Sequence, residues 1–225
     1  MLKTIYHGSD KIIEKPLFGY GKIHNDYGLG FYCTENANMA MEWGVSKERN
    51  GFANAYQIET DRLSVFDLNS GKYTILHWLA ILLENRIFDI TSPLAYESKN
   101  YILKNFSTPY KDYDIITGYR ADDSYFSFAQ DFINGAISVR QLGNAMKLGN
   151  LGTQFVLKSK KAFKAIRFKG AEMAEAEKWF AKKESRDKNA RRQYFDEEKN
   201  RRQRGDLYIV QILDEEIKSD DPRLR

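Results

Sequence analysis

The sequence predicts an α+β domain followed by a charged helical extension. Short alternating runs with β-forming residues, such as KTIYHGS, GFYCT and TQFVL, are separated by apolar stretches with helical periodicity. A chain of 225 residues is long enough to bury roughly 70% of its unfolded surface in a sizeable core. After Gly170 the composition changes to Ala, Glu, Lys and Arg. We therefore expect one domain over residues 1–170 and an extension over residues 171–225.

The elements expected in the first half follow from local patterns. KTIYHGS is a strand stopped by Gly-Ser, and a loop rich in glycine follows until the strand GFYCT. Thr34 or Asn36 is placed to cap the helix ENANMAMEWGVS. NAYQIETDRLSVFDL contains two β-like pieces around a polar turn, and the continuous apolar run YTILHWLAILLENRIF predicts a buried helix.

The second half begins with the buried strand YDIITGYRADD, which leaves into a loop. Helix SYFSFAQDFING is capped by Asp123 or Ser124 and ended by Gly135, and the shorter helix SVRQLGNAMKLGN follows. TQFVLKS predicts a strand, and KAFKAIRFKG a short helix and a further strand. Residues 171–204 contain no glycine or proline, so we expect one long helix, followed by the apolar element GDLYIVQILDEEIK.

Composition restricts the class of protein. The single cysteine, Cys33, excludes a disulfide framework and a Cys-based zinc site, and it alternates away from Tyr32 on the strand, so it is expected in the core. His24 and His77 lack metal-ligand companions at a telling spacing, so no metal is predicted. Neither a signal peptide nor a membrane span is visible, which predicts a cytoplasmic location without membrane contact. A net charge of +4 is too small to indicate nucleic-acid binding by itself.

Two aromatic residues raise the possibility of a ligand slot. Tyr32 follows a glycine-rich turn, and Trp43 comes eleven positions later, at a place where a helix can fold back over the strand. Two ring faces there could flank one flat ligand. His7, Gly8 and Ser9 leave the first strand together, so His7 could orient a hydroxyl and the Gly8 backbone could pair with a carboxamide. Taken singly, His7, Tyr32 and Trp43 are each more often structural residues, and only their combination with the flanking glycines favours a ligand site.

These motifs resemble those of a known superfamily. YHGS, GFYCTEN with the spaced Trp43, and TQFVL look like the three motifs of the ADP-ribosyltransferases, in the His-Tyr-Glu branch that includes the diphtheria-toxin catalytic domain and the poly(ADP-ribose) polymerases. YDIITGYRADD, TQFVLKSKKAF and the tail KKESRDKNARRQYF are similar to small bacterial domains of unknown function grouped with those transferases. The resemblance covers nearly the whole chain and implies a split β-sandwich, two packed sheets with an NAD cleft between them.

The resemblance also implies roles for individual residues. It places His7 on the adenosine ribose of NAD, the Gly8 backbone on the nicotinamide carboxamide with Ser9 beside it, and the nicotinamide ring between Tyr32 and Trp43. His7, Tyr32 and Gln154 are the implied catalytic residues. Gln154 stands where the superfamily usually has its catalytic glutamate, so the chain departs from the pattern at this position.

The departure has a physical consequence. Cleavage between nicotinamide and ribose passes through an oxocarbenium-like state, and a nearby carboxylate stabilises its positive charge. Gln154 can hold the ribose hydroxyl but supplies no charge. A unit charge at about 4 Å with an effective dielectric of about 20 contributes about 4 kcal/mol, or roughly three decades in rate. Asp122 or Asp123, after a predicted strand, could supply the carboxylate instead.

The expected function is transfer of ADP-ribose from NAD to a protein or nucleic-acid acceptor with release of nicotinamide. An NAD glycohydrolase and an NAD-binding pseudoenzyme are alternatives, because Gln154 replaces the glutamate. A third alternative is a protein or nucleic-acid binding module that uses the basic helix over residues 171–204. The sequence leaves open the acceptor, the oligomeric state, and whether the role is toxin-like, defensive or housekeeping.

Overall fold

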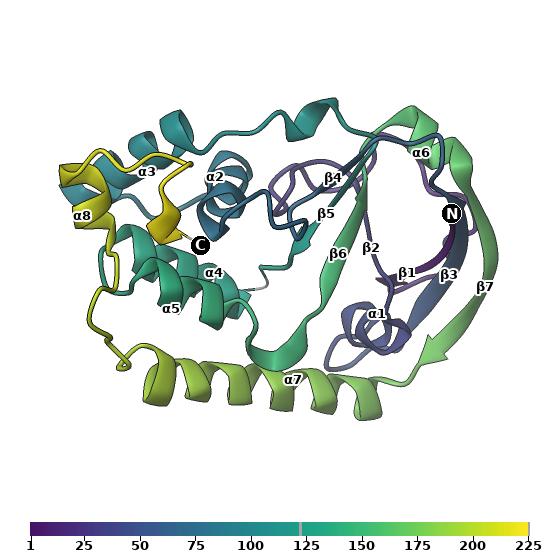
Figure 1. The fold of residues 1–225 in the computed structure, drawn as a ribbon. Helices are drawn as coiled ribbons and strands as arrows, with labels where there is room; N and C mark the ends of the chain where they lie inside the picture. Colours follow the sequence, from purple (N-terminus) through teal and green to yellow (C-terminus); the bar gives the residue numbers. More distant parts are fainter. Residues whose placement is uncertain (122, 225) are drawn as a thin grey trace.

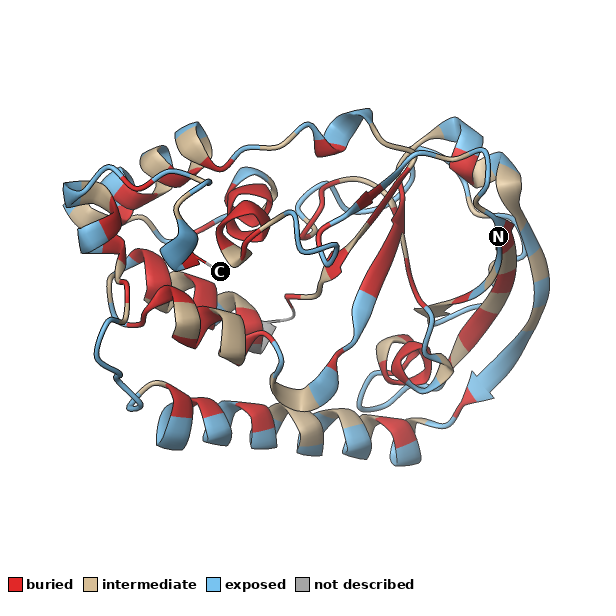
Figure 2. Ribbon diagram, in the orientation of Figure 1, coloured by how far each residue is buried: buried red, intermediate tan, exposed pale blue. Residues whose placement is uncertain are grey.

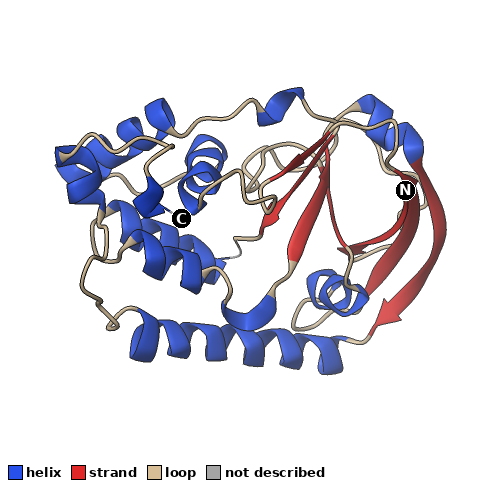
Figure 3. Ribbon diagram, in the orientation of Figure 1, coloured by secondary structure: helices blue, strands red, loops and turns tan. Residues whose placement is uncertain are grey.

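The computed structural model describes residues 1–121 and 123–224, except for the side chains of Asp123 and Ser124. The predicted α+β class is confirmed, because the described strands form one sheet to which the helices add (Figure 3). The strands are β1 Leu2–Ser9, β2 Phe31–Thr34, β3 Gly51–Glu59, β4 Val65–Asp67, β5 Ile115–Tyr119, β6 Thr153–Leu157 and β7 Ile166–Ala174. Their order is β4-β5-β6-β2-β1-β3-β7, with β4 and β5 parallel and the other neighbours antiparallel.

The helices lie mostly on the side of the sheet that begins with β4 (Figure 1). They are α1 Ala37–Gly44, α2 Ile75–Asn85, α3 Pro93–Asn105, α4 Asp123–Ile133, α5 Val139–Ala145, α6 Lys160–Ala165, α7 Ala176–Gln193 and α8 Ile209–Asp214. Short 3-10 turns are η1 Tyr110–Asp112, η2 Leu148–Asn150 and η4 Pro222–Leu224, and η3 Tyr194–Glu198 is π-helical. No helix in the described part of the chain has both the length and the apolar character that a membrane crossing requires.

The sheet is nearly divided between β1 and β2. These strands share a single register pair, Tyr6 with Thr34, whereas β1 and β3 are paired from Leu2 to Ser9. Beyond that pair, β1, β3 and β7 curve away from β2, β6, β5 and β4 (Figure 1). The strands therefore form one hydrogen-bonded order, and not the two separate packed sheets that were expected. The divergence separates the molecule into two halves, and apolar side chains from both groups of strands fill part of the gap between them.

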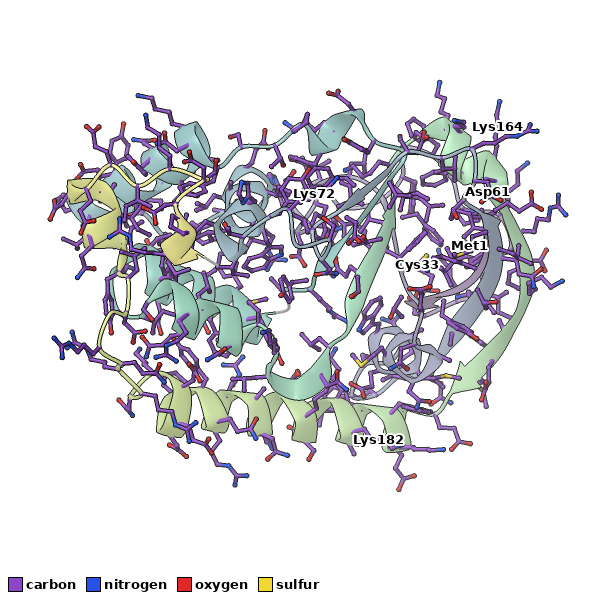
Figure 4. All side chains as sticks on the ribbon, viewed as in Figure 1. Met1, Cys33, Asp61, Lys72, Lys164 and Lys182 are labelled. Atoms are coloured by element: carbon purple, nitrogen blue, oxygen red, sulfur yellow. The ribbon has the colours of Figure 1, made fainter. Side chains whose placement is uncertain are left out.

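Apolar side chains fill both faces of the sheet. The main core joins the inner faces of α2, α4 and α5 to one face of β5 and β6, as the buried stripes in Figure 2 show. A second cluster on the other face contains Ile5, Phe31, Cys33, Phe155 and Leu157. Cys33 is fully buried, so its expected place in the core is confirmed (Figure 4). Its burial raises the pKa of the thiol, which makes a thiolate nucleophile unfavourable.

The predicted single helix over residues 171–204 is wrong at both ends. Residues 171–174 continue β7, where they pair with β3 from Gly51 to Asn54, and α7 begins only at Ala176. The helix ends at Gln193, and the chain then passes through the π-helical turn η3. Backbone pairing with the edge of β3 outweighs the helical propensity of Ala and Glu at the first end. The predicted boundary at Gly170 therefore falls inside a strand.

The segment after β7 packs against the rest of the molecule. The ring of Tyr194 stacks on Phe128 at 3.8 Å between centroids, and its hydroxyl donates to Asp131. Ile209 and Ile212 of α8 are fully buried in the main core. Helix α7 contacts α1 in one half and η2 and α4 in the other, and it runs along the molecule beneath both halves (Figure 1).

Candidate functional site

A pocket of about 570 Å³ lies where β1 and β2 diverge. This volume is within the range of about 300–1,000 Å³ that small-molecule sites occupy. Its lining comes from β1, β2, β6, α1, α7 and the loops that follow β1, α2 and β5: His7, Gly8, Ile13, Pro16, Leu17, Tyr20, Gly21, Asn25, Asp26, Gly30, Phe31, Tyr32, Trp43, Arg86, Arg120, Ala121, Gln154, Lys183, Asp187 and Arg191. The pocket therefore collects residues from five separate parts of the sequence.

His7 bridges the gap between the diverging strands. Its ring lies 4.3 Å from that of Phe31, and its Nδ1 lies 2.7 Å from the carbonyl oxygen of Tyr32. A carbonyl only accepts, so Nδ1 carries the proton and donates, which leaves Nε2 as an acceptor. Burial lowers the pKa of His7, although the hydrogen bond to Tyr32 opposes this effect. The imidazole is therefore neutral near pH 7 and can accept a hydrogen bond from a ligand hydroxyl.

Gly8 lines the pocket, whereas Ser9 stabilises the loop after β1. A Cβ on Gly8 would lie 2.1 Å from the Ala40 carbonyl oxygen and 2.7 Å from Cβ of Trp43, so glycine allows α1 to pack directly on β1. The Gly8 backbone lines the pocket. Ser9 is not among the lining residues; its hydroxyl donates to the Lys11 carbonyl at 2.5 Å and accepts from Asn54 at 3.1 Å. Ser9 thus shapes the loop after β1.

Asn54 holds that same loop in place. It is fully buried, and its Nδ2 donates to the carbonyl oxygens of His7 and Lys11 at 3.2 Å each. Its Oδ1 accepts from the Ile13 amide at 2.8 Å. These bonds fix the start of the loop that carries Pro16, Leu17 and Tyr20 along the pocket.

Tyr32 presents its ring to the pocket while its hydroxyl is used elsewhere. The hydroxyl donates to the Gly28 carbonyl at 2.5 Å and accepts from the Tyr27 amide at 3.0 Å. Lys158 also donates to the carbonyls of Tyr27 and Leu29, and burial lowers the pKa of its amine to about 8. Burial raises the pKa of Tyr32, so its hydroxyl stays protonated. The ring face is the part of Tyr32 that a ligand can use.

Trp43 lines the pocket from α1, and Asn36 begins that helix. The Asn36 side chain accepts from the amides of Asn38 and Met39, so Asn36 is the cap, one of the two predicted candidates. The guanidinium of Arg120 lies 4.1 Å from the centroid of a Trp43 ring. One face of the indole is therefore covered by a cation, and a flat ligand meets the other face or displaces Arg120.

Gln154 reaches the pocket from β6. It pairs in register with Thr34 of β2, and Tyr32 pairs with Val156, so Gln154 and Tyr32 lie diagonally on the same face of the sheet. Gln154 is 6% exposed, and its Nε2 donates to Asp26 at 3.3 Å. Among the described residues, its Oε1 has no hydrogen-bond partner.

Helix α7 closes the pocket from below with one stripe of its surface. Lys183, Asp187 and Arg191 are spaced four apart and therefore share one face of the helix. Arg186, on the adjoining face, donates to Glu42 of α1 at 2.9 Å, and both side chains are largely buried. This ion pair ties α7 to the helix that carries Trp43.

The structure brings most of the predicted site residues together. His7, Gly8, Tyr32, Trp43 and Gln154 all line the one pocket, and Ser9 lies behind it.

The alternative carboxylates fall outside the described part of the chain. Asp122 lies outside the described residues, and so does the side chain of Asp123.

Sequence reasoning missed six charged residues of the lining. They are Asp26, Arg86, Arg120, Lys183, Asp187 and Arg191. Arg120 had a usable signal, because it is a charged residue directly after a buried strand. No triplet of His, Cys, Asp or Glu within residues 1–121 and 123–224 is arranged to hold a metal ion.

A family model matches residues 3–168 of the chain. It is described as a protein of unknown function, DUF3990. The chain belongs to the DUF3990 family. The DUF3990 match includes the lining residues of β1, β2, α1 and β6 but ends before α7. No curated protein and no solved structure matches the chain. The expected resemblance to a family of unknown function agrees with this result, and the link to ADP-ribosyltransferases stays a prediction.

Proposed function

We propose that this DUF3990 chain binds NAD in the pocket between β1 and β2 and transfers its ADP-ribose to a macromolecular acceptor. The observation that carries the proposal is the convergence of His7, Gly8, Tyr32, Trp43 and Gln154, predicted as one site from three distant motifs, on one pocket of about 570 Å³. The single register pair between β1 and β2, Tyr6 with Thr34, lets the two strands diverge where the pocket lies.

The polar groups of the pocket fit such a ligand. Oε1 of Gln154 and Nε1 of Trp43 are buried, with no hydrogen-bond partner among the described residues, and a bound ligand can satisfy an acceptor and a donor of this kind. Nε2 of His7 is placed to accept from a ribose hydroxyl, and the ring of Tyr32 is available for stacking on an aromatic base. Four cationic side chains in the lining suit the phosphates: Arg86, Arg120, Lys183 and Arg191.

In the proposed reaction, the bond between ribose C1′ and the nicotinamide nitrogen breaks, and its electron pair neutralises the pyridinium. An acceptor oxygen or nitrogen forms the new bond to C1′ and releases its proton to water. The chain contributes by holding the two sugar hydroxyls and the ring, which fixes the reacting geometry. Gln154 holds a hydroxyl without adding charge, so NAD binding without turnover and hydrolysis to free ADP-ribose are the competing outcomes.

The test measures nicotinamide release and NAD affinity for the native chain and two variants. Tyr32→Ala should weaken NAD binding by about 1–3 kcal/mol, because it removes a stacking surface. Tyr32→Phe keeps the ring and loses only the hydroxyl bonds to Tyr27 and Gly28, so it should retain NAD affinity within about threefold. A cell lysate supplies acceptors, and mass gain on protein or nucleic acid identifies the target class.

The outcomes separate the candidate functions. Nicotinamide release with a labelled acceptor supports the transferase, and release with free ADP-ribose alone supports a glycohydrolase. NAD affinity without release supports a pseudoenzyme. Equal NAD affinity of folded Tyr32→Ala and native chain would contradict the site itself, and absence of any NAD affinity would contradict the proposal.

A further inference from the structure

A buried carboxylate lies directly behind Gln154. Asp26 is 4% exposed and lines the same pocket. Its Oδ2 accepts from the Ala121 amide at 2.8 Å and from Nε2 of Gln154 at 3.3 Å. Its Oδ1 lies 3.5 Å from the guanidinium of Arg86. The amide hydrogen and the arginine both favour the charged carboxylate at this position.

Asp26 determines which way the Gln154 amide points. A carboxylate only accepts hydrogen bonds, so the NH2 group of Gln154 must face Asp26 and Oε1 must face away from it. Gln154 lines the pocket, and its buried Oε1 accepts no hydrogen bond from any described residue. A buried acceptor of this kind is unfavourable until a donor arrives. The arrangement therefore presents one fixed acceptor to a ligand hydroxyl.

We propose that Asp26 and Gln154 together replace the single catalytic glutamate of ADP-ribosyltransferases. Oε1 of Gln154 accepts the hydrogen bond from the nicotinamide ribose hydroxyl, and Asp26 supplies the negative charge. When the bond from C1′ to nicotinamide breaks and its electron pair leaves with the nitrogen, the ribose becomes positively charged, and Asp26 stabilises that charge. Asp26 is thus a positioning residue that acts through Gln154 and through its field. The inference rests on the proposed function.

The carboxylate of Asp26 lies further from the ribose than a glutamate at position 154 would. Its stabilisation of the positive charge is therefore weaker but still present. Coulomb energy falls as the inverse of distance, so a carboxylate at about 7 Å keeps roughly three fifths of the effect it has at about 4 Å. The buried pocket also limits screening by salt. Arg86, 3.5 Å from Oδ1, offsets a further part of the field of Asp26. A carboxylate one amide group further away can therefore support turnover at a rate below that of a glutamate enzyme.

The test compares kcat and KM for NAD, followed by nicotinamide release, in the full-length chain and its variants. Asp26→Asn keeps the size of the side chain and removes the charge, so kcat should fall at least about tenfold while KM changes less than about threefold. Adding Gln154→Glu to Asp26→Asn returns a carboxylate to the pocket, closer to the ribose, and should restore kcat to the native value or above it. Asp206→Asn, which removes a buried carboxylate that pairs with Arg140 away from the pocket, should leave kcat unchanged.

The rescue separates a charge effect from a structural one. A native kcat in Asp26→Asn would overturn the inference, and so would a fall in kcat that Gln154→Glu fails to reverse. If Asp26→Asn does not fold, the kcat of the single variant Gln154→Glu tests the inference instead. A rise of less than about a hundredfold supports Asp26 as the existing charge, because a nearer carboxylate adds only about the remaining two fifths of the effect, and a rise of a hundredfold or more overturns it.

Measurements on the native chain distinguish a failure of this inference from a failure of the proposed function. Release by the native chain with no Asp26 effect leaves the proposed function standing and removes this inference. No NAD binding and no release by the native chain overturn both.

Discussion

Because Gly8 has no side chain, α1 packs close to β1 and brings Trp43 to the pocket. A Cβ there would meet the Ala40 carbonyl oxygen at 2.1 Å and the Gly44 amide at 2.8 Å, and both atoms belong to the backbone of α1. Backbone cannot move aside as a flexible side chain can. Trp43 therefore reaches the pocket because residue 8 allows α1 to lie flat on β1.

Replacing Gly8 by alanine should displace α1 and destabilise the chain. We expect Gly8→Ala to lower the free energy of unfolding by about 1–3 kcal/mol, the usual cost of overpacking a tight contact. Urea denaturation measures this quantity. Gly143→Ala is the control, because a Cβ at Gly143 in α5 meets nothing within 4 Å and alanine favours a helix by about 0.5–1 kcal/mol. Equal stability of the two variants would show that α1 adapts freely.

Residue types and spacing were enough to predict His7, Tyr32, Trp43 and Gln154 in one site, because each lies in a recognisable local motif. Asp26 could not be predicted in the same way. It stands between Asn25 and Tyr27 in a glycine-rich loop, where an aspartate is typical of a turn. Only the tertiary fold brings its carboxylate to 3.3 Å from an amide 128 residues later.

At the scale of elements, one ion pair joins the two helices on either side of the pocket. Arg186 of α7 and Glu42 of α1 are separated by 2.9 Å, with side chains 13% and 10% exposed. Arg186 also pairs with Asp187 of its own helix at 3.0 Å, whereas its contact with Glu42 runs between the two helices. The contact therefore sets where α7 lies relative to Trp43.

Removing the Glu42 side chain should destabilise the folded chain. Glu42→Ala should lower the free energy of unfolding by roughly 2 kcal/mol, because Arg186 loses its charge-assisted hydrogen bond to Glu42 while its ion pair with Asp187 remains. Glu184→Ala, on α7 like Arg186, is the matched control, since the Glu184–Lys188 pair is exposed and contributes less than about 0.5 kcal/mol. Guanidinium denaturation screens charges, so urea is the better denaturant here. A similar loss in both variants would contradict the anchoring role.

Most of the elements could be predicted from local patterns. The ranges of β2, β5, β6, α2, α4 and α8 agree with the apolar runs that predicted them. Helix α3 was missed, although Ser92 caps it and Pro93 occupies its first turn, which is a usual signal for a helix start. The end of β7 could not be predicted from its own sequence, because backbone pairing with β3 determines where the strand ends. The sequence of β3 does not reveal which of its residues pair with β7.

At the scale of the whole molecule, residues after 174 complete the main core. Ala190, Tyr194, Ile209 and Ile212 are each fully buried in it. The truncation of one buried large aliphatic residue costs about 2–5 kcal/mol, and a domain has only about 5–15 kcal/mol of stability. Residues 1–174 alone should therefore lack a stable native state.

A chain that ends at residue 174 tests this expectation. We expect no cooperative urea transition, followed by circular dichroism, and recovery of the transition when residues 175–225 are co-expressed as a separate fragment. A cooperative transition of the short chain alone would show that residues 1–174 fold independently, close to the domain of residues 1–170 that the sequence predicts.

The position of α7 has a consequence for synthesis on the ribosome. Protein chains emerge at about 5–20 residues per second, amino-terminal end first. His7, Tyr32 and Gln154 leave the ribosome before Lys183, Asp187 and Arg191, which close the same pocket. A nascent chain therefore carries an unfinished site, and the ability to bind a ligand there arrives only with the last quarter of the sequence.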